Sequence, residues 1–229
     1  MKLLARMIAF LSFLVMFQYG AYAQSGNKIY VEQIGSGSTV NLTQTGQSNE
    51  IGNATLKAIV NGNNNTVSID QIGNSNTAKL NVQGDGATIS STATGDNNVV
   101  DISCGAAGAC GASNITNTIT GDGNQVTQQT DNLMDSTVTI TSDNNTVNII
   151  NTSTATAGAK SFVDISGGGG NLVDITQAGA AGANGHDASV TIVGATNNVD
   201  IRQGGSVDSK VVSTINGSGN ALTIKSNHN

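Results

Sequence analysis

Few side chains in this sequence could carry acid–base or nucleophilic chemistry, and they do not lie close together along the chain. The two histidines are His186, within a Gly/Asn/Asp segment, and His228, near the end of the sequence. Neither has a neighbouring serine or cysteine that resembles a nucleophile elbow or a Cys–His pair. Sugar-cleaving β-helices need carboxylates that converge in a cleft, whereas the acidic residues here are scattered. We therefore expect no catalytic residue, no cofactor and no enzymatic activity.

Aspartates recur at one outward position of several candidate strands. They are Asp101, Asp174 and Asp200, together with Asp164 in a similar Phe-Val-Asp-Ile run. Stacked on neighbouring strands, they would form an acidic column that could bind Ca²⁺ through oxygen ligands. Alternatively, such residues keep a sheet soluble and discourage lateral pairing. The second interpretation is favoured, and we predict no metal site.

Outward threonines are also frequent, and a flat array of them can organise water, as it does in ice-binding proteins. Candidates are Thr137, Thr139 and Thr141 in one strand, with Thr39, Thr43, Thr66 and Thr146 elsewhere. However, Asn, Asp, Lys and Glu interrupt the threonines, and Thr is an ordinary exposed strand residue. Ice binding is therefore an alternative to the main expectation.

The two cysteines lie close together in the small-residue segment Cys104-Gly-Ala-Ala-Gly-Ala-Cys110. In an exported protein, two cysteines at this spacing predict a disulfide that closes the loop. Free thiols or a metal pair are the alternatives, and the absence of an adjacent histidine argues against metal.

The remaining polar side chains follow a nine-residue frame. In its first clear copy Ser38 is position zero, Val40 and Leu42 are at +2 and +4, Gln44 is at +6 and Gly46 at +8. Further complete copies begin at Asn27, Asn65, Asn171 and Asn197. Side chains of a strand alternate between its two faces, so all the even positions share one face. Each copy therefore predicts a half-buried strand that ends in a turn.

One copy of the frame cannot be stable alone. Burying its two apolar side chains contributes about 3–6 kcal/mol, whereas ordering nine residues costs about 9–18 kcal/mol of backbone entropy. Copies must therefore stack, and the inward amides of adjacent copies would bond in ladders that satisfy their buried polar groups. The expected ladder residues are Asn27, Gln33, Ser38, Gln44, Asn65, Gln71, Asn171, Gln177, Asn197 and Gln203.

The expected fold is all-β: a β-solenoid (β-helix) of stacked two-strand coils, each a strand-turn-strand repeat of about 22–26 residues. Glycine and asparagine tolerate the positive φ of tight corners. The glycines expected at the turns are Gly35, Gly46, Gly73, Gly179 and Gly205.

The start of the chain predicts export. Residues 1–23 combine a basic start, a short apolar run and an Ala-x-Ala site, as secretory signal peptides do. A membrane anchor is the alternative, but the run is short for a bilayer span. Residues 24–229 would then form one solenoid domain, with loop insertions near 104–112, 152–160 and 178–187. We expect it to pass through the periplasm and reach the cell surface or the medium.

The composition argues against a nucleic-acid partner. The net charge is −6 and charged residues make up 10% of the chain, whereas phosphate contacts require clustered Lys and Arg. No membrane span is expected after removal of the signal peptide.

The frame resembles the curlin repeat of bacterial curli subunits. Asn27, Gln33, Gly35, Ser38 and Gln44 follow its double motif, and Asn65, Gln71, Gly73 and Asn76 match its first part. The resemblance implies a secreted functional amyloid, a fibre subunit or minor component that serves extracellular matrix, adhesion and biofilm. It also implies self-association into fibres, with a nucleator or major subunit and a dedicated outer-membrane secretion channel as further partners.

A monomeric surface adhesin or a ligand-binding solenoid is the other functional hypothesis. A monomer should cap both ends of the stack with polar or irregular segments. The frame begins almost directly after the signal peptide, and little chain follows Ile224, so assembly is the favoured expectation.

Overall fold

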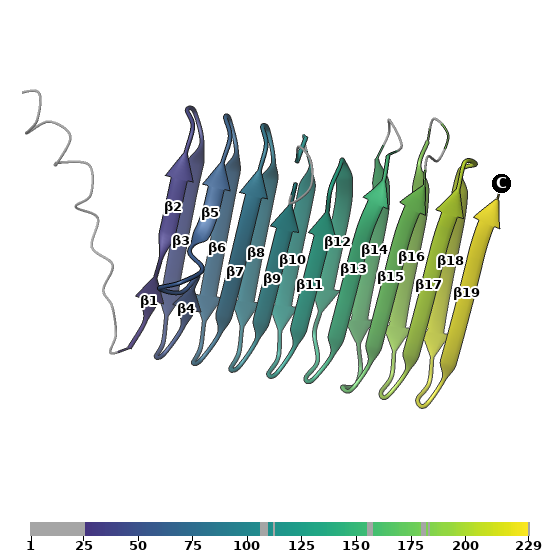
Figure 1. The fold of residues 1–229 in the computed structure, drawn as a ribbon. Coiled ribbons are helices and arrows are strands. Elements are labelled where there is room, and N and C mark those ends of the chain that lie inside the picture. The colour runs from purple at the N-terminus through teal and green to yellow at the C-terminus, as the bar shows by residue number, and fades with distance from the viewer. Residues whose placement is uncertain are drawn as a thin grey trace, which may run out of the picture.

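The computed structural model describes residues 26–105, 110–111, 113–154, 158–179, 182 and 184–228. These residues form an all-β solenoid of about 8 turns, as expected. Two parallel sheets lie back to back, and their strands stack along one axis (Figure 1). None of the described residues belongs to a helix long and apolar enough to cross a membrane. The expected signal peptide, residues 1–23, lies outside the described part of the chain.

The chain alternates between the two sheets, so that each coil has one strand in sheet A and one in sheet B. Sheet A contains β1 (Lys28–Ile29), β2 (Val31–Ile34), β4 (Glu50–Ile51), β5 (Ala58–Asn61), β7 (Thr77–Gln83), β9 (Val99–Cys104), β11 (Gln125–Thr130), β13 (Thr146–Ser153), β15 (Leu172–Gly179), β17 (Asn198–Gly205) and β19 (Ala221–His228). Sheet B contains β3 (Thr39–Thr45), β6 (Thr66–Ile72), β8 (Thr88–Thr94), β10 (Asn114–Thr120), β12 (Met134–Ile140), β14 (Ala159–Ser166), β16 (His186–Val193) and β18 (Ser209–Asn216).

The strands pair in the register that the nine-residue frame predicts. In sheet A, for example, Val147 lies opposite Val173, and Val173 lies opposite Val199. These valines are fully buried between the sheets. The alternation of apolar and polar residues therefore builds columns of like side chains along the solenoid axis, with the polar residues outside.

The structure differs from the expected strands in three places. The first two strands of sheet A are interrupted at Tyr30 and at residues 52–57, which bulge out of the sheet between β4 and β5. The strand β15 continues to Gly179 and β16 begins at His186, so the insertion expected at 178–187 is shorter. Residues 106–109, 112, 155–157, 180, 181 and 183 of the three expected insertions lie outside the described residues.

The two edges of the solenoid, where the chain turns between sheets, are built differently. We call the turns from sheet B to sheet A the asparagine corner; they are residues 46–49, 73–76, 95–98, 121–124, 141–145, 167–171, 194–197 and 217–220. The opposite edge, which we call the loop corner, contains the short turns 35–38, 62–65, 84–87, 131–133 and 206–208 and the insertions after β9, β13 and β15. In Figure 1 the asparagine corner is the lower edge.

Candidate functional site

A buried ladder of asparagines runs along the whole asparagine corner. The backbone N–H of each rung donates to the Oδ1 atom of the asparagine one coil earlier. The rungs are Asn27, Asn49, Asn76, Asn98, Asn124, Asn145, Asn171, Asn197 and Asn220, with N···Oδ1 distances of 2.9–3.1 Å. From Asn49 to Asn197 the rungs are at most 1% exposed. Each coil therefore presents an acceptor that fits the backbone of the next coil.

The side-chain nitrogens of this ladder satisfy the carbonyls of the corner glycines. Asn76 Nδ2 donates to the Gly95 carbonyl at 2.7 Å, and Asn98 Nδ2 donates to the Gly121 carbonyl at 2.7 Å. The oxygen and the nitrogen of the Asn76 amide both bond to the next turn, while its backbone N–H bonds to the rung before, so the residue links three coils. A buried polar group without such partners would cost about 1–3 kcal/mol.

At several turns of the asparagine corner, glycine is required for a steric reason as well as a conformational one. Gly73 has a φ of +117°, and a Cβ at this position would overlap the carbonyl of Gly95 in the next coil. Gly46 lies in the same way against Gly73. Gly46 and Gly73 therefore cannot be replaced by a larger residue while the coils keep their spacing. The expected turn residues Gly35, Gly179 and Gly205 lie on the loop corner and also have positive φ.

The expected glutamines form two separate pairs instead of one ladder through the stack. Gln44 Nε2 donates to Gln71 Oε1 at 2.9 Å in sheet B. Gln177 Nε2 donates to Gln203 Oε1 at 3.0 Å in sheet A. The first column stops because Ala93 lies opposite Gln71, whereas the second pair lies between the shorter polar side chains of Asn151 and Ser226.

Two of the expected ladder residues, Ser38 and Asn65, lie on the loop corner. The backbone N–H of Asn65 donates to Ser38 Oγ at 3.1 Å, and that of Ala87 donates to Asn65 Oδ1 at 2.9 Å. The ladder ends at Ala87, which has no side-chain acceptor. Gln33 lies opposite Val60 and donates to the Ser38 carbonyl, so it stacks on no amide.

Individual cross-links hold the insertions of the loop corner. Cys104 and Cys110 form a disulfide across the segment that follows β9. Directly before the last strand of sheet B, the Asp208 carboxylate accepts N–H bonds from Asn184 at 3.0 Å and Gly185 at 2.9 Å. The Asn184 backbone N–H is the main reason that the pKa of the Asp208 carboxyl lies below its ordinary value.

Of the two histidines, His186 lies in the interior of the solenoid. The His186 ring is fully buried next to this turn, with Nδ1 at 2.8 Å from Ser209 Oγ and Nε2 at 3.0 Å from the Ala178 carbonyl. The side chain of His228, at the end of β19, lies outside what the structure describes. His186 therefore joins two coils and does not face solvent as a catalytic base would.

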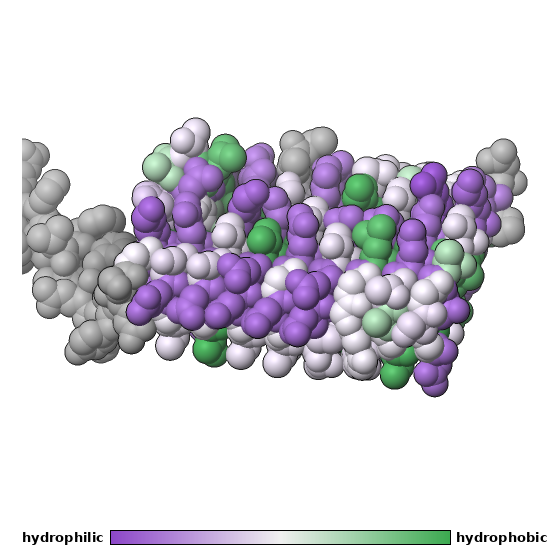
Figure 2. All heavy atoms as spheres, turned by 90° about the horizontal axis from the view of Figure 1, so that it is seen from below, coloured by the Kyte–Doolittle hydropathy of each residue, from purple (hydrophilic) through white to green (hydrophobic). Residues whose placement is uncertain are grey.

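A second, exposed row of side chains lies outside the asparagine ladder. The backbone N–H groups of Asn74, Asp96 and Asp122 donate to the carboxylates one coil later, at 2.6, 2.7 and 2.8 Å. The row ends after Asp143, where Gly167–Gly170 form the next turn. Figure 2 shows this edge as a hydrophilic stripe that gives way to a paler stretch.

The expected acidic column is discontinuous. Asp174 lies beside Asp200, whereas Thr127 and Asn148 separate Asp101 from Asp174. Asp164 belongs to the other sheet, because its strand β14 is in sheet B. Lys79 and Arg202 lie 3.7 and 3.0 Å from the carboxylates of Asp101 and Asp200. Among the described residues, no three His, Cys, Asp or Glu side chains gather closely enough to hold a metal ion.

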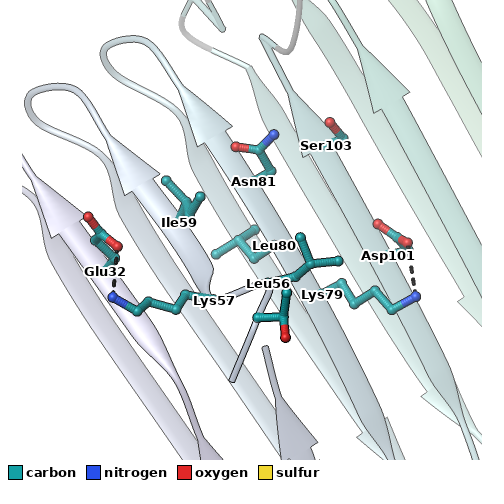
Figure 3. A pocket seen from close by; sticks show the side chains of 10 residues that line it. Glu32, Leu56, Lys57, Ile59, Lys79, Leu80, Asn81, Asp101 and Ser103 are labelled. Atoms are coloured by element: carbon teal, nitrogen blue, oxygen red, sulfur yellow. Dashed lines mark hydrogen bonds and ion pairs between the residues drawn. The ribbon is translucent and has the colours of Figure 1, made fainter. Parts of the chain in front are cut away.

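The bulge at residues 52–57 borders a depression of about 580 Å³ on the outer face of sheet A (Figure 3). Leu56 of the bulge is 65% exposed and overhangs it. Two ion pairs flank the floor: Lys57 with Glu32 at 3.0 Å, and Lys79 with Asp101 at 3.7 Å. Both lysines are therefore already neutralised, and the depression offers no unpaired charge to a ligand.

At each end of the described solenoid, the strands pair on one side only. These strands are β1, β2 and β3 at one end and β18 and β19 at the other. Their inward side chains are less covered than those of the central coils: Ile29 is 38% and Val31 44% exposed, and Val40, Leu222 and Ile224 are only partly buried. Each end therefore combines an open row of backbone N–H and C=O groups with an open apolar edge.

The chain matches no protein-family model, no curated protein and no solved structure.

The sequence analysis missed most rungs of the asparagine ladder. Asn49, Asn76, Asn98, Asn124, Asn145 and Asn220 were not among the expected ladder residues. Most of them close a Gly-x-x-Asn turn, such as Gly73-Asn-Ser-Asn76. That motif, more than the Gln at +6, was the signal for the ladder.

Proposed function

We propose that this protein is a secreted structural subunit that self-associates end to end into curli-like amyloid fibres. Such fibres would serve an extracellular matrix, adhesion or biofilm. The observation that carries the proposal is the asparagine ladder, in which every coil accepts the backbone of the next coil through the same hydrogen bond. A stack built in this way can be extended by any further coil of the same kind.

The two ends of the solenoid supply the surfaces for this association. Asn220 Oδ1 occupies the position from which each earlier rung accepts a backbone N–H, and β18 and β19 offer unpaired backbone groups beside it. At the other end, Ile29 and Val31 lack apolar cover. Stacking one copy on another would pair these strands and bury these side chains, as each internal coil already does.

The experiment that tests the proposal follows assembly of the chain without residues 1–23. A freshly desalted sample should show a lag in Thioflavin T fluorescence and then unbranched fibres in negative-stain micrographs. Preformed fibres should shorten the lag, because their ends present ready-made coils. A monomer that persists at high protein concentration, with no Thioflavin T fluorescence and no fibres, would contradict the proposal.

A variant pair tests whether inward amides set the rate of assembly. Gln71→Ala removes the buried acceptor of Gln44, whereas Thr43→Ala changes an outward side chain of the same sheet. We expect Gln71→Ala to lengthen the Thioflavin T lag more than Thr43→Ala does. Gln33→Ala should have the smaller effect of an amide that stacks on no other amide. Equal lag times for all variants would count against the role of the amides.

A further inference from the structure

One surface of the solenoid lies apart from the ladder and the open ends, and it carries only hydroxyl groups. It covers the outer face of the strands β8, β10 and β12 in the middle of sheet B, except at their N-terminal ends, where Thr88, Asn114 and Asp135 lie side by side. Its residues, which we call the hydroxyl patch, are Ser90, Thr92, Thr94, Thr116, Thr118, Thr120, Thr137 and Thr139. All are exposed or half-buried, and no side chain among them has a hydrogen-bond partner within the described protein.

The hydroxyl groups of the patch form a regular lattice because the three strands pair in register, with no bulge between them. Thr92, Thr118 and Thr139 lie side by side on consecutive strands. A parallel row contains Ser90, Thr116 and Thr137, and Thr94 lies beside Thr120 in a third. Hydroxyls therefore repeat at about 4.8 Å across the strands and about 6.6 Å along them, as the geometry of a pleated sheet requires.

We infer that this patch binds ice, by holding a layer of ordered water that continues into the crystal. The two repeats of the lattice are close to spacings between oxygen atoms in hexagonal ice. Each hydroxyl supplies one donor and two acceptor positions, and each threonine methyl lies beside the hydroxyl as an apolar group. Because threonine is stiff at χ1, ordering this layer requires little loss of side-chain freedom.

The composition of the patch favours ice over other occupants. It contains no charged group, which would hold water in a shell of its own geometry, and no aromatic ring on which a sugar could stack. A second sheet is disfavoured because it would cover these hydroxyls and leave them without hydrogen-bond partners. Across the strands, the lattice ends at Asp70 and Ile72 of β6 and at Phe162 and Asp164 of β14. Along the strands, it ends at Asn114 and Asp135.

The test measures how much protein a slowly grown ice crystal takes up from dilute solution. Thr118→Tyr places a bulky ring at the centre of the patch, while tyrosine remains a good strand former. The matched control is Thr127→Tyr, the same change on the outer face of sheet A in the neighbouring strand β11. Far-ultraviolet circular dichroism should show that both variants keep the fold of the unmodified protein.

We expect the unmodified protein and Thr127→Tyr to enter the ice to the same extent, and Thr118→Tyr to stay in the liquid. The unmodified protein should also slow the recrystallisation of fine ice grains. Exclusion of the unmodified protein from ice would overturn the inference, as would equal uptake of the two variants. The result does not depend on fibre formation, because uptake is measured on freshly purified protein before any lag phase ends.

Discussion

The two edges of the solenoid return the chain from one sheet to the other through different kinds of turn. At the asparagine corner every turn closes with an asparagine that bonds to the coil before it, and from Asn49 to Asn197 these asparagines are buried. At the loop corner the equivalent ladder ends at Ala87, and later turns differ in length and chemistry.

The difference shows which edge determines the register of the stack. The ladder stays continuous through turns of four residues and through the five-residue turns 141–145 and 167–171, because each turn still ends in an asparagine that bonds to the coil before it. Loss of that asparagine would leave buried polar groups unpaired. The loop corner tolerates insertions because exposed backbone can bond to water instead. One edge therefore holds the coils in register, and the other accommodates variation.

The largest expected effect comes from the corner glycines. Gly73→Ala should destabilise the protein by about 3–5 kcal/mol, the upper end of what single substitutions do, because the new methyl group overlaps the Gly95 carbonyl. Gly170→Ala is the matched control: its φ of +75° is also unfavourable, but its Cβ would meet only Thr196 at 3.4 Å. The control should cost about 1–2 kcal/mol. Urea denaturation measures both, and equal values would refute the steric explanation.

The next largest loss of stability is expected from a substitution in the buried ladder, compared with one in an exposed turn. Asn98→Ala removes the acceptor of the Asn124 N–H and the donor to the Gly121 carbonyl. We expect a loss of about 2–4 kcal/mol, because these groups are left unpaired. Asn63→Ala, on the loop corner, removes the acceptor of the Ser36 N–H at an exposed site, where water replaces it. If thermal denaturation gave the same loss for both variants, burial of the ladder would not be its source of stability.

A smaller effect concerns the insertion after β9, which a covalent bond holds in place of a ladder. Replacing both Cys104 and Cys110 by alanine should cost about 2 kcal/mol, the loop-closure entropy of a short cross-linked loop. Hydrogen exchange should rise in β10, which follows the loop, and stay unchanged in β17. Uniform acceleration in both strands would show that the disulfide stabilises the whole solenoid and not this insertion.

The smallest effect is a pH dependence confined to the loop corner. The Asp208 carboxyl has a pKa below its ordinary value of 3.8, chiefly because the Asn184 backbone N–H donates to its charged form. A lowered pKa in the folded state means that this stabilisation is complete above the ordinary value and is lost as the pH falls through the lowered one. Amide exchange at Asn184 and Gly185 should therefore accelerate in this acid range. Asp208→Asn should remove the pH dependence; if exchange in that variant still followed pH, another group would be responsible.

Much of the fold could be predicted from the sequence because it depends on local alternation. Val40 and Leu42, two residues apart, already indicate a strand with one buried face, and the recurrence of the frame indicates stacking. The assignment of Asp164 to the same column as Asp174 was wrong, because sheet membership depends on counting every coil across the insertions.

The contacts between coils were harder to predict, since they depend on register over unequal spacings. The pairing of Thr92, Thr118 and Thr139 crosses the disulfide segment, so the hydroxyl patch looked interrupted in the sequence. The glutamine ladder is shorter than expected because the rungs that end it, Ala93, Asn151 and Ser226, lie in imperfect copies of the frame. The uninterrupted ladder was found in the turns, where no apolar pattern points to it.

The most direct test of the proposed assembly is the structure of the fibres themselves, by X-ray fibre diffraction and cryo-electron microscopy. End-to-end stacking predicts strands perpendicular to the fibre axis, with a meridional reflection at about 4.8 Å. It also predicts a density in which the solenoid of one copy continues into the next. Fibres whose strands run along the axis, or whose copies touch through the faces of the sheets with both ends left open, would contradict it.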